Sequence, residues 1–289
     1  MSATRPLKGI LLICLVALLL ACLDSLSKAL AAGYGVLLVL WVRYLTQSLL
    51  LAAWQWPRRG RPPLRVQCPA LQLWRGLSLL GLSLFFLSAL SLLPQGEATA
   101  VQFLAPLLVV VLAVPLLGER ASLGQWLAVG LGFAGVLIIV RPGGGLLTPA
   151  MLLPVCSATC YALYQIFTRL IGTRDSAAVS NLCTGVIGLT GLSLLLPGFW
   201  AGWPEAGALL AMASLGAFAV VIHTLLTVAF QSCSPVLLAP FGYLQIPFAA
   251  LLGLLVFDHR PEPGALLGMA VIIASGLLSA ALQARRRPR

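Results

Sequence analysis

Long apolar runs limit the folds that this sequence can adopt. Ten stretches of 18 or more mostly apolar residues follow one another along the chain, and a helix of that length crosses the roughly 30 Å of hydrocarbon in a bilayer. Hydrophobic residues make up 60% of the chain and charged residues 9%, a balance that soluble domains do not have. The sequence therefore predicts an all-α polytopic membrane protein with ten transmembrane helices. We expect these helices at 9–31, 35–56, 71–93, 97–117, 123–140, 149–170, 177–196, 206–230, 235–257 and 264–282.

Short loops and missing motifs argue against an enzyme. Only the segments 57–69 and 197–207 hold more than a turn or two, which leaves no room for a soluble catalytic domain. The chain contains no Gly-x-Ser-x-Gly elbow, no His-Glu-x-x-His motif and no Walker loop. Its seven cysteines form no Cys-x-x-Cys motif, and it has only two histidines. We therefore expect no enzymatic activity, no cofactor and no metal ion.

Basic residues are divided unevenly between the two sides of the predicted membrane. Only Arg141 and Arg260 lie on the side opposite the termini. The side with both termini also holds Arg58, Arg59, Arg61, Arg65, Arg120, Arg169, Arg174, Arg285, Arg286, Arg287 and Arg289. Because the Lys- and Arg-rich side of a membrane protein faces the cytoplasm, we expect both termini to be cytoplasmic. The net charge of +11 then reflects orientation and contact with membrane lipids, not binding to nucleic acid.

The chain contains an internal repeat. Residues 94–139 align without gaps on residues 234–279 after a shift of 140 positions, which pairs Arg120 with Arg260. We therefore expect two repeats of five helices, at 1–145 and 146–289, each with a helix that opens on closely spaced small residues suited to tight packing. An odd number of spans per repeat makes the second repeat inverted, a geometry suited to alternating access. One chain then suffices for a transport pathway, and a homodimer is also compatible with it.

Several stretches resemble the EamA-type transporters of the drug/metabolite transporter superfamily. They are "LDSLSKAL", "WVRYL", "LGERASLGQWLAVGLGFAGVLIIVRPG" and "LLGLLVFDHRPEP". The strongest are the turn formed by Gly118, Glu119 and Arg120, which we take as structural, and the intramembrane Arg43. The second turn departs from the pattern, because Asp258 occupies the glycine position.

This resemblance implies a function as well as a fold. It implies a ten-helix secondary transporter in the cell inner membrane, an exporter or exchanger of a small-molecule substrate. The most similar bacterial members are assigned to amino acids, riboflavin or S-adenosylmethionine. The alternative is a membrane scaffold or lipid-translocating protein that carries no small solute and tolerates neutral replacement of its intramembrane charges.

Two opposite charges lie at similar depth in the first two predicted helices. Asp24 precedes the turn near residue 33 by nine residues, and Arg43 follows it by ten, so both lie about 13 to 15 Å from the turn. An unpaired charge there costs at least about 2.5 to 3.5 kcal/mol, so the two side chains should meet. The pair then either locks the hairpin or lines a cavity that holds a substrate carboxylate and amine. Lys28, one turn nearer the surface than Asp24, should extend toward the interface as an interfacial charge.

Other polar and aromatic side chains within the spans are candidates for the same cavity. Polar groups should face protein or water-filled space, since lipid offers them no partner. We therefore add to the candidate substrate site Trp41, Gln47, Gln102, Tyr161, Tyr164, Gln165, His223, Tyr243 and Gln245. Pro106, Pro115 and Pro247 should bend their helices. Glu97, at the start of the fourth span, complements the positive end of a helix in a structural role.

Overall fold

The computed structural model describes residues 6–55, 66–118, 120–140, 148–172, 174–175, 177–199, 202–232, 238 and 241–286. These residues form helices and turns and contain no strand. The helices are α1 (Pro6–Tyr34), α2 (Val36–Gln55), α3 (Pro69–Leu92), α4 (Gln95–Gln102), α5 (Ala105–Leu117), α6 (Leu123–Val140), α7 (Leu152–Ile171), α8 (Ala177–Leu195), α9 (Ala206–Ser232), α11 (Gln245–Phe257) and α12 (Pro263–Arg286). Short 3₁₀ turns at Pro149–Met151 and Leu196–Phe199 precede α7 and follow α8.

The helices confirm a multi-pass membrane protein. Within the described residues, nine helical segments are long and apolar enough to cross a membrane, and α11 is a shorter apolar helix of 13 residues. Large apolar side chains such as Leu123, Leu194 and Leu255 are at least 70% exposed, as expected of a surface covered by lipid. The predicted ninth span, 235–257, lies partly outside the described residues.

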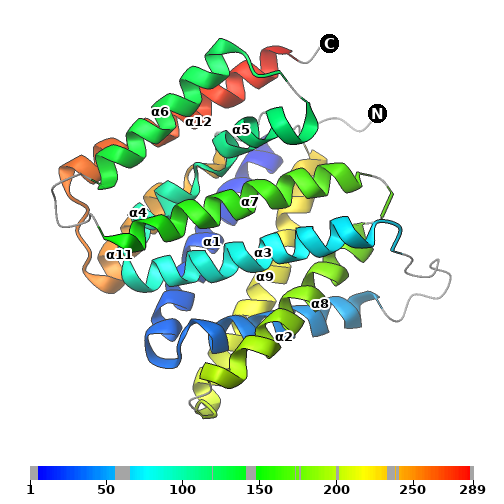
Figure 1. The fold of residues 1–289 in the computed structure, drawn as a ribbon. Helices are drawn as coiled ribbons and strands as arrows, with labels where there is room; N and C mark the ends of the chain where they lie inside the picture. The colour runs from blue at the N-terminus through cyan, green and yellow to red at the C-terminus, as the bar shows by residue number, and fades with distance from the viewer. Residues whose placement is uncertain are drawn as a thin grey trace.

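The helices form one bundle in which sequence neighbours are not always the closest partners (Figure 1). The helices α1 and α2 form a hairpin at Gly35, yet each packs more extensively on α9 than on the other. The long helix α3 packs on α7 and α8, and α6 pairs with α12 at one edge of the bundle. The start of α1 and the end of α12 lie on the same side of the bundle as the α5–α6 turn, which we call the termini side. The α1–α2 and α11–α12 turns lie on the opposite side.

Glycines allow α6 and α12 to approach closely. A Cβ atom on Gly268 of α12 would lie 2.7 Å from the carbonyl oxygen of Gly135 on α6, and a Cβ on Gly135 would lie 3.0 Å from the carbonyl oxygen of Gly268. Neither position has room for a side chain. Gly268 is one of the small residues expected to allow close packing at a helix start, whereas its partner Gly135 lies in the second half of α6.

The fourth span is broken, which corrects the single helix predicted over 97–117. The helix α4 ends at Gln102, a turn follows at Phe103 and Leu104, and α5 begins at Ala105. Pro106 has no N–H to continue the α4 hydrogen-bond ladder, but suits the first turn of a new helix. A matching turn at Tyr243 and Leu244 precedes α11, and α11 begins two positions before Pro247. The bends expected at Pro106 and Pro247 are therefore short interruptions of the helix, and Gln95–Leu117 remains one segment long enough to cross a membrane. No interruption occurs at Pro115, which lies inside α5.

The turns that follow α5 and α11 share one backbone conformation. Gly118 ends α5 with φ 67° and ψ 20°, and Asp258 ends α11 with φ 53° and ψ 27°. Aspartate tolerates this left-handed region better than most residues, so the change from glycine leaves the turn intact. Of the predicted structural turn, Arg120 is exposed, and Glu119 lies outside the described residues.

Candidate solute-binding site

Asp24 of α1 forms a hydrogen bond with the first residue of α11. The amide Nε2 of Gln245 donates to Oδ2 of Asp24 over 3.1 Å, and Asp24 is only 7% exposed. Gln245 reaches this position because α11 starts directly after the turn at Tyr243 and Leu244. The break in the ninth span thus brings a polar side chain to a buried carboxylate. Sequence reasoning placed both residues in the candidate site.

Arg43 of α2 lies close enough to Asp24 for an electrostatic interaction, but the two form no ion pair within 4.0 Å among the described residues. This corrects the expected direct pair. The reason lies in the packing, because α1 and α2 are both held chiefly against α9. The Nε atom of Arg43 is buried and has no hydrogen-bond partner. His223 of α9 is exposed and also lies within range of the Arg43 charge.

Aromatic rings from the two helix breaks meet. The ring centroids of Phe103 and Tyr243 lie 5.0 Å apart with the planes tilted by 46°. Gly276 of α12 leaves space for the Tyr243 hydroxyl, because a Cβ there would collide with it. Next to this ring pair, Oε1 of Gln102 at the end of α4 is buried without a hydrogen-bond partner. The breaks therefore supply flat apolar surface beside unpaired polar atoms.

The remaining predicted residues lie elsewhere or have no contact to this group. Trp41 donates from Nε1 to the hydroxyl of Ser193 on α8 over 2.8 Å. On α7, the rings of Tyr161 and Tyr164 stack with centroids 6.2 Å apart. Gln47 and Gln165 are partly buried, and neither has a side-chain contact to Asp24 or Arg43 among the described residues.

Lys28 is buried, which corrects the expectation that it extends toward the interface. Its side chain is 8% exposed, and Nζ donates to the carbonyl oxygen of Leu93 over 2.6 Å. The ammonium also lies 5.2 Å from the centre of the Phe257 ring. The carbonyl is available because α3 ends at Leu92, and the ring supplies a cation–π contact.

A buried polar cluster on the termini side was not predicted. Arg75 of α3 is 3% exposed, and all its hydrogen bonds go to α7 and α8. Its guanidinium donates to the hydroxyls of Thr168, Thr184 and Tyr164 and to the carbonyl oxygen of Ser180, over 2.5 to 2.8 Å. The sequence indicated this cluster only through an arginine inside an apolar run. Hydropathy does not show which residues would bind that arginine.

Asp175 extends this cluster into the loop between α7 and α8. Its carboxylate accepts from Nε2 of Gln72 over 2.8 Å and from the backbone N–H of Gln67 over 2.7 Å. These two hydrogen bonds, that from Gln72 first, hold the pKa of Asp175 below its ordinary value. The cluster thus connects α3, α7 and α8 on the termini side.

The group around Asp24 has the chemistry of a binding site for a small polar solute. It offers a carboxylate, a guanidinium with an unpaired N–H, an amide oxygen with no partner and two aromatic rings. A zwitterion or a planar heterocycle could satisfy these groups together. Within the described residues, no three His, Cys, Asp or Glu side chains lie close enough to hold a metal ion.

Comparison with known proteins identifies the first half of the chain. A model of the EamA-like transporter family matches residues 7–141. This segment of the chain is therefore similar to the EamA-like transporter family. The described helices of this segment are α1 to α6, which include Asp24, Arg43 and Gln102.

Relatives of the whole chain are named as transporters of small metabolites. The S-adenosylmethionine uptake transporter of Rickettsia bellii is 26% identical over 88% of this chain and 87% of that protein. The riboflavin transporter of Rhizobium johnstonii is 29% identical over 79% of this chain and 76% of that protein. The aromatic amino acid exporter YddG of Ancylobacter novellus is 28% identical over 72% of this chain and 74% of that protein. The match to the EamA-like family and the names of these relatives support a small-metabolite transporter.

A solved structure shares the fold along nearly the whole chain. One protein of known crystal structure superposes with a TM-score of 0.64 at 23% identity, covering 97% of this chain and 99% of that chain. This similarity extends beyond residues 7–141 into the second half of the bundle.

Proposed function

We propose that this protein is a secondary active transporter that exchanges or exports a small metabolite by alternating access. The observation that carries the proposal is the polar group of Asp24, Arg43 and Gln245, in which the Asp24 side chain and the Nε atom of Arg43 are buried among apolar helices near two helix interruptions. Buried polar atoms without partners are costly, so a site that keeps them unpaired gains by binding a solute. Broken helices at a central site are also typical of secondary transporters.

In this proposal Arg43 binds a carboxylate or other anionic group of the solute. Asp24, oriented by Gln245, accepts from an amine or N–H group, and Gln102 offers a second acceptor. Phe103 and Tyr243 would pack on an aromatic or heterocyclic part. The named substrates of the relatives each combine a planar ring with polar groups, which fits this arrangement. Substrates of the same class are therefore the first to test here.

The proposal includes two inverted repeats at 1–145 and 146–289. The packing supports this repeat. If each helix is replaced by its counterpart in the other half, one observed helix–helix contact becomes another observed contact. The contact of α3 with α7 corresponds to that of α9 with α1, and the contact of α2 with α9 corresponds to that of α8 with α3. The breaks at Phe103 and Tyr243 also lie 140 positions apart, as do the turns at Gly118 and Asp258. Alternating access would then be a movement of one half against the other.

The main test is solute flux through purified protein in liposomes. Liposomes loaded with a mixed metabolite extract, spiked with S-adenosylmethionine, riboflavin and tryptophan, are assayed by mass spectrometry for solutes that leave. We expect specific solutes to cross with the wild type and at least tenfold more slowly with Asp24→Asn or Arg43→Gln, the loss that follows from about 1.4 kcal/mol of binding energy. Asp258→Asn is the matched control, because that side chain is 89% exposed and lies at the opposite end of α11 from Gln245.

Either of two results would contradict the proposal. Equal flux in the wild type and in both site variants would make the polar group structural, as a membrane scaffold or lipid-translocating protein requires. If no solute crosses in liposomes that contain correctly folded wild type, the proposed transport function itself is contradicted.

Orientation is a separate part of the proposal. We propose that both termini are cytoplasmic and that the protein lies in the cell inner membrane, because the termini side carries most of the Lys and Arg residues. Green fluorescent protein fused to the C-terminus should fluoresce, and alkaline phosphatase fused there should be inactive. The reverse pair of results would invert the topology.

A further inference from the structure

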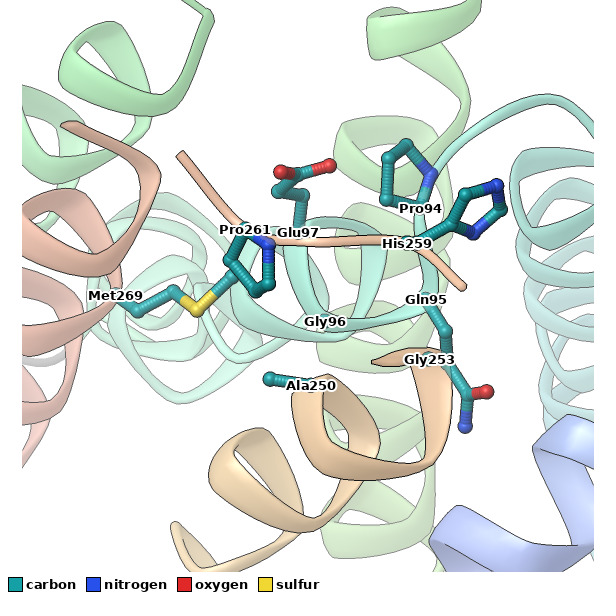
Figure 2. Close-up of a pocket in the computed structure, with 9 residues that line it drawn as sticks. All are labelled: Pro94, Gln95, Gly96, Glu97, Ala250, Gly253, His259, Pro261 and Met269. Atoms are coloured by element: carbon teal, nitrogen blue, oxygen red, sulfur yellow. The ribbon is translucent and has the colours of Figure 1, made fainter. Parts of the chain in front are cut away.

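A second polar group lies toward the side opposite the termini and shares no residue with the candidate solute site. The start of α4, the end of α11 and the loop that follows α11 enclose a small pocket there (Figure 2). Its space of about 10 Å³ holds roughly one water molecule. Glu97 of α4 lines this pocket together with His259 and Pro261 of the loop.

Glu97 is a buried carboxyl with an unsatisfied oxygen. It is 3% exposed, and its Oε2 atom has no hydrogen-bond partner. The closest cation is Lys28, whose ammonium interacts electrostatically with Glu97 but donates its hydrogen bond to Leu93 instead. The two form no ion pair within 4.0 Å among the described residues. An ionised carboxylate in this place would lack the hydrogen bonds that compensate burial.

The other groups that face Glu97 do not stabilise a negative charge. Glu262 of the loop lies near enough to repel it. Partial burial and the charge of Lys28 hold the pKa of His259 below its ordinary value, so His259 is neutral at pH 7. Asp258 and Arg260 of the loop are more than 80% exposed and lie 4.0 Å from each other. The pocket walls from α11 and α12 are Ala250, Gly253 and Met269, which carry no charge.

The start of α4, beside Glu97, packs tightly against α11 and α12. A Cβ on Gly96 would lie 2.9 Å from Cα of Ala250 on α11 and 3.2 Å from Cε of Met269 on α12. A carboxylate therefore has space for about one water and not for a hydration shell. If α4 and α11 separated, water would reach Glu97 from the side opposite the termini.

We propose that Glu97 is a proton-binding site, distinct from the solute site, that links the closing of α4 against α11 to the pH on the side opposite the termini. In the closed arrangement Glu97 is a neutral carboxylic acid. On opening, it transfers its proton to water, which leaves a hydrated carboxylate and a hydronium ion. Because the closed state binds one more proton than the open state, acid on that side favours closure.

The test is a pH titration of purified full-length protein in liposomes by infrared difference spectroscopy. The carbonyl-stretch band of a protonated carboxylic acid reports the proton directly, without any solute. We expect a band that the wild type retains at neutral pH and that Glu97→Gln lacks. Glu205→Gln, at an exposed glutamate on the same side, is the matched control and should retain the band.

Two further variants test the link to closure. Glu262→Gln removes the repelling carboxylate, so the midpoint of the Glu97 band should shift to lower pH. Ala250→Leu wedges α4 from α11 and hydrates Glu97, so its midpoint should also shift to lower pH. Each variant is first checked for folding by gel filtration.

The outcomes separate clearly. A band unchanged in Glu97→Gln would overturn the proton site, and an unchanged midpoint in folded Ala250→Leu would overturn its link to closure. The effect on flux rests on the proposed transport function, which the infrared titration does not require. Where the wild type transports, acid on this side should slow it more than it slows Glu97→Gln, and equal slowing would also overturn the link.

Discussion

Arg75 and Arg43 differ in how their side chains are satisfied. The guanidinium of Arg75 makes four hydrogen bonds to α7 and α8, so it joins helices and has little capacity left to bind a ligand. Arg43 keeps a buried Nε without a partner. A hydrogen bond to a solute anion would satisfy the unpaired N–H of Arg43, whereas the hydrogen bonds of Arg75 are already made within the protein. For this reason we assign solute binding to Arg43 and a structural role to Arg75.

Asp175 gives the termini-side cluster a dependence on pH. Its folded pKa is lowered, so its contribution to stability is complete above the ordinary carboxyl pKa of about 4 and is lost as the pH falls through the lower folded value. Asp175→Asn should lower the unfolding temperature at pH 7 by about 3 to 6 °C, the shift for about 1.5 kcal/mol in a chain of this size. Its unfolding temperature should also fall less than that of the wild type between pH 5 and pH 3, on the order of the same few degrees.

The measurement is thermal unfolding of detergent-solubilised protein across this pH range. Asp258→Asn provides the control, since its exposed carboxylate makes no comparable hydrogen bonds. Identical pH profiles for wild type and Asp175→Asn would show that the Gln72 and Gln67 hydrogen bonds do not stabilise the fold.

Residue-level prediction from sequence brought Asp24 and Arg43 within electrostatic range of each other, but it did not identify the hydrogen-bond partner of Asp24. Asp24 and Arg43 were placed at the same level of the membrane by counting residues from the hairpin turn. That count gives no rotation about the helix axis, and α9 holds both helices so that Gln245 becomes the hydrogen-bond partner of Asp24. Lys28 failed for a similar reason, because a free carbonyl at Leu93 was within its reach.

At the scale of elements, proline and glycine determine how the helices break and pack. Pro106 starts α5 after the Phe103 turn, so the fourth span ends one helix and begins another. The sequence indicated a bend there, but not that the backbone would leave the helix for two residues. Glycines determine how closely helices pack, since α6 and α12 approach each other at positions that carry no side chain.

The α6–α12 contact predicts opposite effects for one substitution at two glycines. Gly268→Ala forces a Cβ against the Gly135 carbonyl, so it should destabilise the protein by about 1 to 3 kcal/mol. Gly130→Ala, on the same pair of helices, meets nothing within 4 Å and should stabilise by about 0.5 to 1 kcal/mol through helix propensity. Thermal unfolding of both variants checks the prediction. Equal effects at the two positions would show that the close contact does not form.

At the scale of the whole molecule, a multi-pass helical protein was predictable because hydropathy encodes its spans. The family resemblance was predictable from particular residues, such as the turn at Gly118 and the intramembrane Arg43. The Arg75 cluster was not, since its partners lie about 90 to 110 positions away in sequence and only the packing of α3 on α7 and α8 brings them together. We propose that the Arg75 cluster supports the bundle and that the solute binds at the Asp24 group, between the two halves.

Counterflow tests this central claim most directly. Liposomes containing the protein are loaded with excess unlabelled solute, one that crosses in the flux assay, and the labelled solute is then added outside. An alternating-access carrier should accumulate label transiently above its equilibrium level, and Asp24→Asn should lose this overshoot while Asp258→Asn keeps it. Label that only equilibrates in the wild type, or an undiminished overshoot in Asp24→Asn, would contradict a carrier whose solute site contains Asp24.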